Sequence, residues 1–310
     1  MKKKSILVSL VALLGLVGVS CSFSGATFNL LRNVERSAGG LEQRQIEVKG
    51  LRIEYLEGGK GETLVLLHGF GANKDNWTRM AKHLTPHFRV IAPDLPGFGE
   101  SASNPDGDYT ILVQAERVKE FVQALGIKSF HLGGNSMGGF IAGAYGSRFP
   151  EDLKSLLLIA PAGVAAAEPS DLFRLLLAGK PNPLIAENEK DYEVLLDFVF
   201  VKRPFLPWPI KKFLAREAVA RQPLNSRIFQ QLRSSADTPP LEVMLKGLPA
   251  PTLIIWGRED RVLHVSGAKI LASVMPRAKT EIMDKVGHAP MIEKPQETAA
   301  RYLGFVKEAP

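Results

Sequence analysis

A pentapeptide near the middle of the chain places the strongest constraint on its fold. Residues 134–138 read Gly-Asn-Ser-Met-Gly and lie between an apolar strand-like run at 130–132 and a helix-like run at 140–145. A serine on a sharp turn from strand to helix adopts a strained backbone, so the residues two positions before and after it must be small. Glycine-rich turns between strands and helices also occur without any chemistry, which leaves a purely structural turn open. The pattern makes Ser136 the candidate nucleophile.

Apolar runs typical of strands buried on both faces recur along the chain, and helical segments separate them. The strand-like runs follow a candidate hairpin at 45–56 and cover 63–67, 88–92, 130–133, 156–160 and 252–256, and residues 279–283 are expected to form the last strand. Helical spacing of apolar residues predicts helices at 111–125 and 296–306. This alternation predicts an α/β fold, with a mostly parallel sheet covered by helices on both faces. Ligands bind such sheets at the carboxyl ends of the strands.

One long segment interrupts the alternation. Residues 164–247 contain helical apolar pieces and no strand pattern. We therefore expect a helical cap at 164–247, inserted into a core formed by residues 45–163 and 248–310. The 310-residue chain has an ordinary globular composition, 45% hydrophobic and 23% charged, which suffices for a core of this size.

A proline-rich stretch within the cap carries three large apolar side chains, Phe205, Leu206 and Trp208. Exposed apolar side chains over a cleft suit the binding of an apolar ligand. We therefore regard them as candidates for a substrate-binding wall or an interfacial surface. The alternative is that the apolar faces of the cap merely pack on the core.

The N-terminal residues have the features of an export signal. Three lysines precede an apolar run at 6–19, which suits a secretory signal and is short for a membrane span. The only cysteine, Cys21, follows Gly-Val-Ser as in the lipobox of bacterial lipoproteins, although leucine is more usual at the position of Gly18. We expect a signal peptide at 1–20, lipidation of Cys21 and a tether at 21–44. An uncleaved signal anchor is the alternative.

These features predict an exported protein that is attached to a membrane surface by a lipidated N-terminus. Ser22 after the cysteine resembles lipoproteins sorted to the outer membrane of Gram-negative bacteria; otherwise the protein is expected to be periplasmic or secreted. Loss of the leader's three lysines lowers the formal net charge from +7 to +4. Because the chain lacks a run of five or six basic residues, nucleic-acid binding is not supported.

A serine nucleophile needs a general base, and the base needs an acid that orients it. His288 follows the last predicted strand, and Asp260 follows the strand at 252–256. The chain order serine, acid, histidine is the one that this strand–turn–helix architecture uses. We therefore expect Ser136, Asp260 and His288 to form the catalytic group.

Other residues compete for these roles. Glu259 is the alternative acid because it directly precedes Asp260, and His264 on the same loop is expected to be a surface residue. Asp94 also ends a strand, but it precedes the serine in the chain, and we expect it to hold the turn at 94–97.

An oxyanion that develops beside Ser136 needs two aimed N–H groups. The amide of Met137 follows the nucleophile, and the loop at 68–71 reads His-Gly-Phe-Gly, from which Phe70 is the expected second donor. His68 is expected to form structural hydrogen bonds. No histidine, cysteine or carboxylate group has metal-ligand spacing and no dinucleotide motif follows a strand, so neither a metal nor a cofactor is expected.

Five segments together resemble the α/β-hydrolase superfamily over residues 45–307; they lie at 68–71, 94–101, 134–139, 256–260 and 287–290. Within the superfamily, the nucleophile segment and the lipoprotein-like leader resemble those of exported bacterial triacylglycerol lipases. The resemblance implies a lipase or esterase that hydrolyses acyl esters, such as acylglycerols, through an acyl-enzyme.

Two other functions stay open at this point. Carbon–carbon bond hydrolases that act on aromatic ring-fission products share Asn-Ser-Met-Gly-Gly, but they are cytoplasmic and typically have tryptophan where this chain has Ala289. Their oxyanion loop is also richer in glycine. Non-catalytic binding modules of the same fold usually have a damaged triad, whereas this chain has all three residues.

Overall fold

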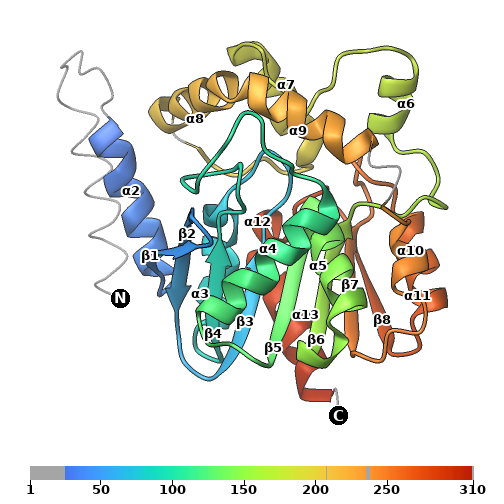
Figure 1. Cartoon of the computed structure of the whole chain (residues 1–310). Helices are drawn as coiled ribbons and strands as arrows, with labels where there is room; N and C mark the ends of the chain where they lie inside the picture. The colour runs from blue at the N-terminus through green and yellow to red at the C-terminus, as the bar shows by residue number, and fades with distance from the viewer. Residues whose placement is uncertain (1–24, 207, 235–237, 309–310) are drawn as a thin grey trace.

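An eight-stranded sheet runs through the middle of the molecule in the computed structural model, which describes residues 25–206, 208–234 and 238–308 (Figure 1). The strand order is β1-β2-β4-β3-β5-β6-β7-β8. The strands are β1 (Glu42–Val48), β2 (Leu51–Gly58), β3 (Glu62–Leu67), β4 (Phe88–Pro93), β5 (Phe130–Ser136), β6 (Leu153–Pro161), β7 (Thr252–Gly257) and β8 (Ala278–Met283). β2 is antiparallel to β1 and β4, and every other pair is parallel. The predicted α/β sheet is confirmed.

Helices cover both faces of this sheet, as the continuous apolar runs predict. In β3, Val65 and Leu67 belong to one apolar cluster, and Leu64 and Leu66 belong to another on the opposite face. The first cluster includes residues of α4 (Ile111–Ala124), α5 (Met137–Arg148), α10 (Leu241–Met244) and α11 (Ser266–Val274). The second includes residues of α3 (Thr78–Leu84), α12 (Pro290–Glu293) and α13 (Pro295–Glu308). Residues 64–67 of β3 are therefore buried whichever way their side chains point.

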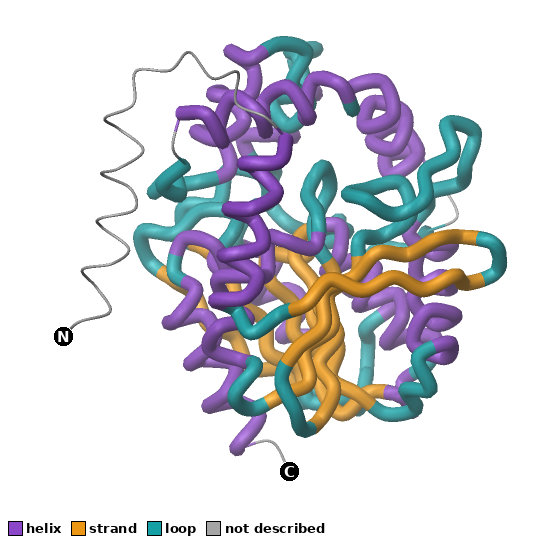
Figure 2. Tube along the Cα trace, turned by 90° about the vertical axis from the view of Figure 1, so that its left-hand side faces the viewer, coloured by secondary structure: helices purple, strands orange, loops and turns teal. Residues whose placement is uncertain are grey.

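The segment between β6 and β7 forms a helical layer over the carboxyl ends of the strands, at the top of Figure 1. Figure 2 shows these helices grouped above the sheet. They are α6 (Asp171–Leu177), α7 (Glu189–Val199), α8 (Trp208–Ala220) and α9 (Gln222–Ser234). Residues 164–206, 208–234 and 238–247 contain no strand. The short helix α10 differs from the others, because it packs against α5 and α11 of the core.

The structure corrects the tether predicted for residues 21–44. Helix α2 (Gly25–Ala38) occupies most of it, and β1 begins at Glu42. Phe28 is buried, and Arg36 is only 2% exposed, so α2 docks on the protein through both an apolar and a charged side chain. The signal peptide and Cys21 lie outside the described residues.

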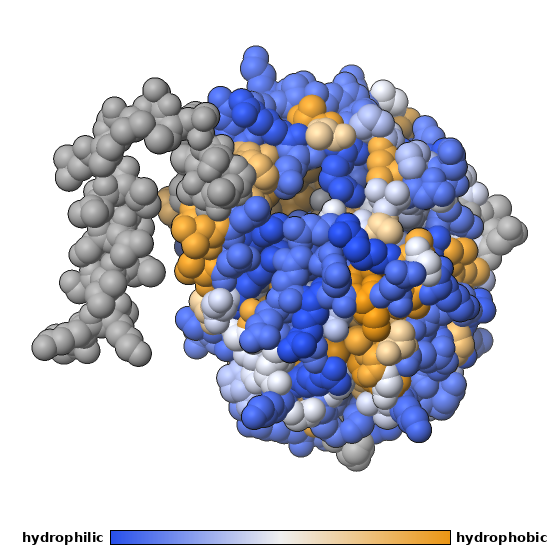
Figure 3. Space-filling view, turned by 60° about the vertical axis from the view of Figure 1, so that its left-hand side comes forward, coloured by the Kyte–Doolittle hydropathy of each residue, from blue (hydrophilic) through white to orange (hydrophobic). Residues whose placement is uncertain are grey.

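The outer face of α2 is apolar: Leu30 is 64% exposed and Val34 is 52% exposed. Figure 3, which brings the α2 side of the molecule forward, shows apolar surface there beside hydrophilic surroundings. Within the described ranges, no helix is both long enough and apolar enough to cross a membrane.

A buried histidine with two polar partners lies at the end of β5 that is remote from Ser136. His131 Nδ1 is 2.8 Å from Ser155 Oγ, and His131 Nε2 is 2.9 Å from Glu62 Oε2. Burial lowers the pKa of His131 below its ordinary value, and the hydrogen bond and charge of Glu62 offset part of this effect. Folding therefore favours the neutral imidazole.

This histidine makes stability depend on pH. The unfolded chain binds a proton on His131 near its ordinary pKa of about 6.5, whereas the folded protein binds it only at lower pH. We expect the free energy of unfolding to fall as the pH drops below about 6.5. Urea denaturation at about pH 7.5 and about pH 5.5 measures this, and His131→Gln should show a smaller difference. An equal pH dependence in the two proteins would contradict this account.

Candidate active site

The turn between β5 and α5 has the strained geometry that the sequence predicts. Ser136 adopts φ 55° and ψ −120°, a region that is costly for any residue with a side chain. A Cβ on Gly134 would lie 2.1 Å from the carbonyl oxygen of Gly138, and one on Gly138 would lie 2.3 Å from that of Leu67. Only glycine fits at both positions, so the turn holds the serine at the end of β5 and at the start of a helix.

The histidine and the acid predicted from the sequence meet directly. His288 Nδ1 lies 2.8 Å from Asp260 Oδ2. The side chain of Asp260 is fully buried, and its Oδ1 accepts hydrogen bonds from the amides of Val262 (2.8 Å) and Leu263 (3.0 Å). Oδ2 also accepts a hydrogen bond from Trp256 Nε1 at 3.1 Å. These donors fix the carboxylate, which in turn orients the imidazole and directs its Nε2 away from the acid.

The competing residues have other partners. Glu259 Oε2 accepts a hydrogen bond from the amide of Val286 at 3.0 Å, so this side chain supports the loop that carries His288. His264 is half-buried, and its Nδ1 lies 2.9 Å from Ser266 Oγ. The geometry therefore assigns Asp260, and not Glu259, to the imidazole.

A cavity of about 660 Å³ under the cap brings the predicted residues together. Ser136, His288 and Phe70 line it, as do the cap residues Phe205 and Leu206. Asp260 lies behind His288, outside the lining. Phe205 is 83% exposed, so part of its ring faces solvent.

The remaining predicted residues lie beside this cavity, or their side chains lie outside the described part of the structure. Met137 is buried as the first residue of α5, where its amide is one of the free N–H groups of a helix N-terminus. Donation of hydrogen bonds to an oxyanion by Met137 and Phe70 stays a prediction. The side chain of Trp208 lies outside the described residues, although its backbone begins α8.

His68 holds the loop that carries Phe70. The amide of Leu95 donates to His68 Nε2 at 3.0 Å, so the proton of the neutral ring is on Nδ1, which lies 2.8 Å from the carbonyl oxygen of Gly69. Burial lowers the pKa of His68, in agreement with this neutral tautomer. The histidine thus ties the loop after β3 to the turn after β4, as the sequence predicts for a structural residue.

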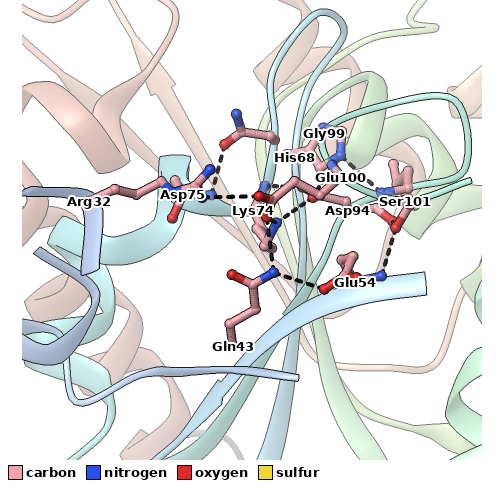
Figure 4. Close-up of polar contacts among 12 residues, drawn as sticks. Arg32, Gln43, Glu54, His68, Lys74, Asp75, Asp94, Gly99, Glu100 and Ser101 are labelled. Atoms are coloured by element: carbon pink, nitrogen blue, oxygen red, sulfur yellow. Dashed lines mark hydrogen bonds and ion pairs between the residues drawn. The ribbon is translucent and has the colours of Figure 1, made fainter. Parts of the chain in front are cut away.

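A buried ion pair closes the other end of this loop (Figure 4). Lys74 is 1% exposed, and its Nζ lies 2.5 Å from Asp94 Oδ2 and 2.6 Å from Glu100 Oε2. Asp94 Oδ1 accepts a hydrogen bond from the amide of Lys74, and Asp94 Oδ2 accepts one from the amide of Glu100. Burial raises the pKa of Glu100, but the Lys74 ammonium and nearby arginines overcome this effect and hold it at about 2. Sequence reasoning missed this lysine, because a single lysine in a loop gives no sign of burial.

The backbone of His288 is fixed on both sides. Its amide donates to the carbonyl oxygen of Val199, the last residue of cap helix α7, at 2.9 Å. Its carbonyl oxygen accepts a hydrogen bond from Asn135 Nδ2 at 3.1 Å. Asn135, which precedes Ser136, and the end of a cap helix therefore both position His288.

Glu293 extends this connection between the cap and the histidine loop. Its Oε1 accepts a hydrogen bond from the amide of Gly287 at 2.8 Å. Its Oε2 accepts hydrogen bonds from the amides of Val201 (3.0 Å) and Lys202 (2.9 Å), which follow α7. Burial raises the pKa of Glu293, and the three amide donors offset part of this effect. One carboxylate thus joins two chain segments beside His288, a role that the sequence does not reveal.

Comparison with known proteins places this geometry in a family. A family model described as alpha/beta hydrolase fold matches residues 62–295. Lipase 1 of Psychrobacter immobilis is 35% identical over 300 residues, which cover 94% of this chain and 93% of that protein. Lipase 3 of Moraxella sp. (strain TA144) is 36% identical over 306 residues, which cover 96% of each. The crystal structure of a membrane phospholipase A, described as a bacterial virulence factor, matches with a TM-score of 0.90 at 46% identity, covering 99% of this chain and 100% of that one.

Glu293→Gln tests whether this carboxylate positions the histidine. An amide retains the shape but replaces one acceptor oxygen with a donor, so one of the bridging hydrogen bonds is lost. Because small displacements of a general base are costly, we expect the reaction of Ser136 with a fluorophosphonate probe to slow by about ten- to a hundred-fold. The rate of labelling is measured by mass spectrometry.

Glu297→Gln is the matched control. Glu297 pairs with Arg301 on α13, and its substitution makes the same change of charge four residues away in the sequence. Its labelling rate should equal that of the unaltered protein. An unchanged rate in Glu293→Gln would show that the bridge does not position His288.

Proposed function

Because the chain belongs to the alpha/beta hydrolase fold family and is a serine ester hydrolase, we propose that Ser136, His288 and Asp260 are its catalytic triad. The observation that carries this proposal is the 2.8 Å contact between His288 Nδ1 and Asp260 Oδ2, with His288 and Ser136 lining one cavity. The contact leaves Nε2 of His288 as the atom that exchanges a proton with the serine.

The reaction proceeds through a covalent acyl-enzyme. Ser136 Oγ attacks the ester carbonyl carbon and transfers its proton to His288 Nε2, while Asp260 stabilises the resulting imidazolium. The amides of Met137 and Phe70 stabilise the oxyanion. As the intermediate collapses, the alcohol leaves with the proton from Nε2. Water then gives a proton to His288 and attacks the acyl carbon. As the second intermediate collapses, His288 returns this proton to Ser136 Oγ, and the carboxylic acid is released.

The proposed substrates are acyl esters of glycerol lipids. Two relatives that cover nearly the whole chain are named lipases, and a structural neighbour at 46% identity is named a phospholipase. Apolar cap residues, including Phe205 and Leu206, line the cavity that contains the serine. Such a lining suits an acyl chain better than it suits a charged product of aromatic ring fission.

We also propose that the protein is exported and is attached to the cell envelope through lipidated Cys21. The three lysines, the apolar run at 6–19 and the single cysteine support this proposal. A lipid-anchored enzyme meets water-insoluble esters at the surface where they are located.

Ser136→Ala tests the nucleophile. The variant retains the small side chain that the turn accepts but has no attacking oxygen, so we expect hydrolysis of p-nitrophenyl esters to fall to the background rate. Activity near that of the unaltered protein would exclude Ser136 as the nucleophile.

Asp260→Asn tests the acid. It should lower kcat by about ten thousand-fold, because the amide favours the wrong imidazole tautomer.

Glu259→Gln is the matched control for the acid. It changes the adjacent residue in the same way, and it affects the hydrogen bond from Val286 rather than a contact with His288. If Glu259→Gln were more damaging than Asp260→Asn, the assignment of the acid would be wrong.

The preferred acyl-chain length is measured with p-nitrophenyl esters. An increase in kcat/KM from acetate toward palmitate esters identifies a lipase, and activity on acetate and butyrate alone identifies a short-chain esterase.

Lipidation is tested by metabolic labelling with a fatty acid. We expect the full chain produced in a Gram-negative host to incorporate the label and to begin at Cys21, and Cys21→Ala to remain unlabelled. An unlabelled wild-type protein that keeps residues 1–20 would instead indicate an uncleaved signal anchor.

A further inference from the structure

Helix α2 contributes to the cavity that contains the nucleophile. Phe28, Leu31 and Arg32 of α2 line the same cavity as Ser136. This helix lies before residue 62, where the match to the family model begins. The cavity is therefore completed by an element outside the segment that defines the family.

Charged side chains fix α2 against the core. Arg36 forms two hydrogen bonds to the carboxylate of Asp75, at 2.5 and 2.7 Å, and Arg32 Nη2 lies 3.0 Å from Glu100 Oε1. Asp75 belongs to the short helix η1 (Lys74–Trp77), which follows the loop that carries Phe70. Paired planar contacts of this kind set orientation as well as position. The cavity-facing side of α2 is thus part of a fixed wall.

An aromatic stack joins this wall to the cap. The rings of Phe28 and of Phe213, in α8, lie 4.2 Å apart with an interplanar angle of 27°. The guanidinium carbon of Arg32 lies 5.5 Å from the centre of the Phe28 ring. Phe28 is only 8% exposed, and both residues line the cavity. The stack therefore forms part of the cavity wall where α2 meets the cap.

Neighbouring side chains make this part of the lining apolar. Ile210 and Leu214 lie close to Phe213 in the sequence of α8, and Leu31 follows Phe28 by three residues on α2. All of them line the cavity. Positions three or four apart share one face of a helix, so α2 and α8 each present apolar side chains to the same space. The charged side chains of Arg32, Glu35 and Glu217 flank this apolar part of the lining.

We propose that the acyl chain of the substrate lies between α2 and α8 and contacts the Phe28–Phe213 stack. The N-terminal helix is then a determinant of acyl-chain selectivity. This inference rests on the proposed ester hydrolysis at Ser136. A butyryl group is short and ends near the serine, whereas a longer chain extends along the apolar wall and gains contacts there.

Phe28→Ala and Phe213→Ala in the full chain test the inference, with p-nitrophenyl butyrate and p-nitrophenyl dodecanoate as substrates. The measured quantity is the ratio of kcat/KM for dodecanoate to kcat/KM for butyrate. We expect each variant to lower this ratio by about ten-fold or more, as is typical when apolar contacts to a substrate are removed. An unchanged or increased ratio in both variants would overturn the inference.

Leu30→Ala is the matched control, because Leu30 lies on the same helix, is 64% exposed and faces solvent. It should leave the ratio unchanged. Phe28→Leu restores an apolar side chain without the ring, so it should recover part of the ratio and should exclude loss of α2 docking as the cause. A different combination of results would point to loss of α2 docking. In that case Phe28→Leu would not recover the ratio, both Phe28 variants would have a lowered melting temperature, and Phe213→Ala would leave the ratio unchanged. This combination would overturn the inference. Absence of Ser136-dependent butyrate hydrolysis in the unaltered protein would instead overturn the proposed function.

Discussion

The close approach of backbone segments around Ser136 is the constraint on which the rest of the site depends. A serine held at φ 55° costs about 1–3 kcal/mol in backbone strain, so the surrounding structure must enforce it. The enforcing contacts are direct: a Cβ on Gly138 would lie 2.4 Å from the carbonyl oxygen of His68. The same contact that maintains the strain therefore places the loop after β3 beside the nucleophile, where an oxyanion would form.

Several buried polar groups near the site have defined partners. Lys74 is buried with Asp94, His68 is neutral, and Asp260 is surrounded by donors. Breaking a buried pair such as Lys74–Asp94 costs about 3–5 kcal/mol, because it leaves one charge unpaired. These contacts fix the loops around the cavity that Ser136 and His288 line.

The sequence predicts local features well and contacts between distant segments poorly. Central strands such as 63–67 and 252–256 are evident because they are apolar runs, and Asp260 and His288 are evident because each follows a predicted strand. Helix α2 was missed because its segment is mostly small and polar, and because its docking depends on a contact between Arg36 and Asp75. Glu293 gave no signal, since its partners in the cap come from residues about ninety positions earlier. Partners of this kind are fixed only by the folded chain.

The position of β8 in the sheet has a consequence for local unfolding. Within the described part of the chain, β8 pairs with β7 alone, and several of its residues are at least partly exposed. The loop with His288 directly follows this edge strand, whereas Ser136 ends β5 near the centre of the sheet. Edge strands open at a lower free energy than central strands do. Ser136 therefore adjoins central strands, whereas the loop with His288 adjoins an edge strand, so we expect local opening of this edge to separate the two residues before the sheet unfolds.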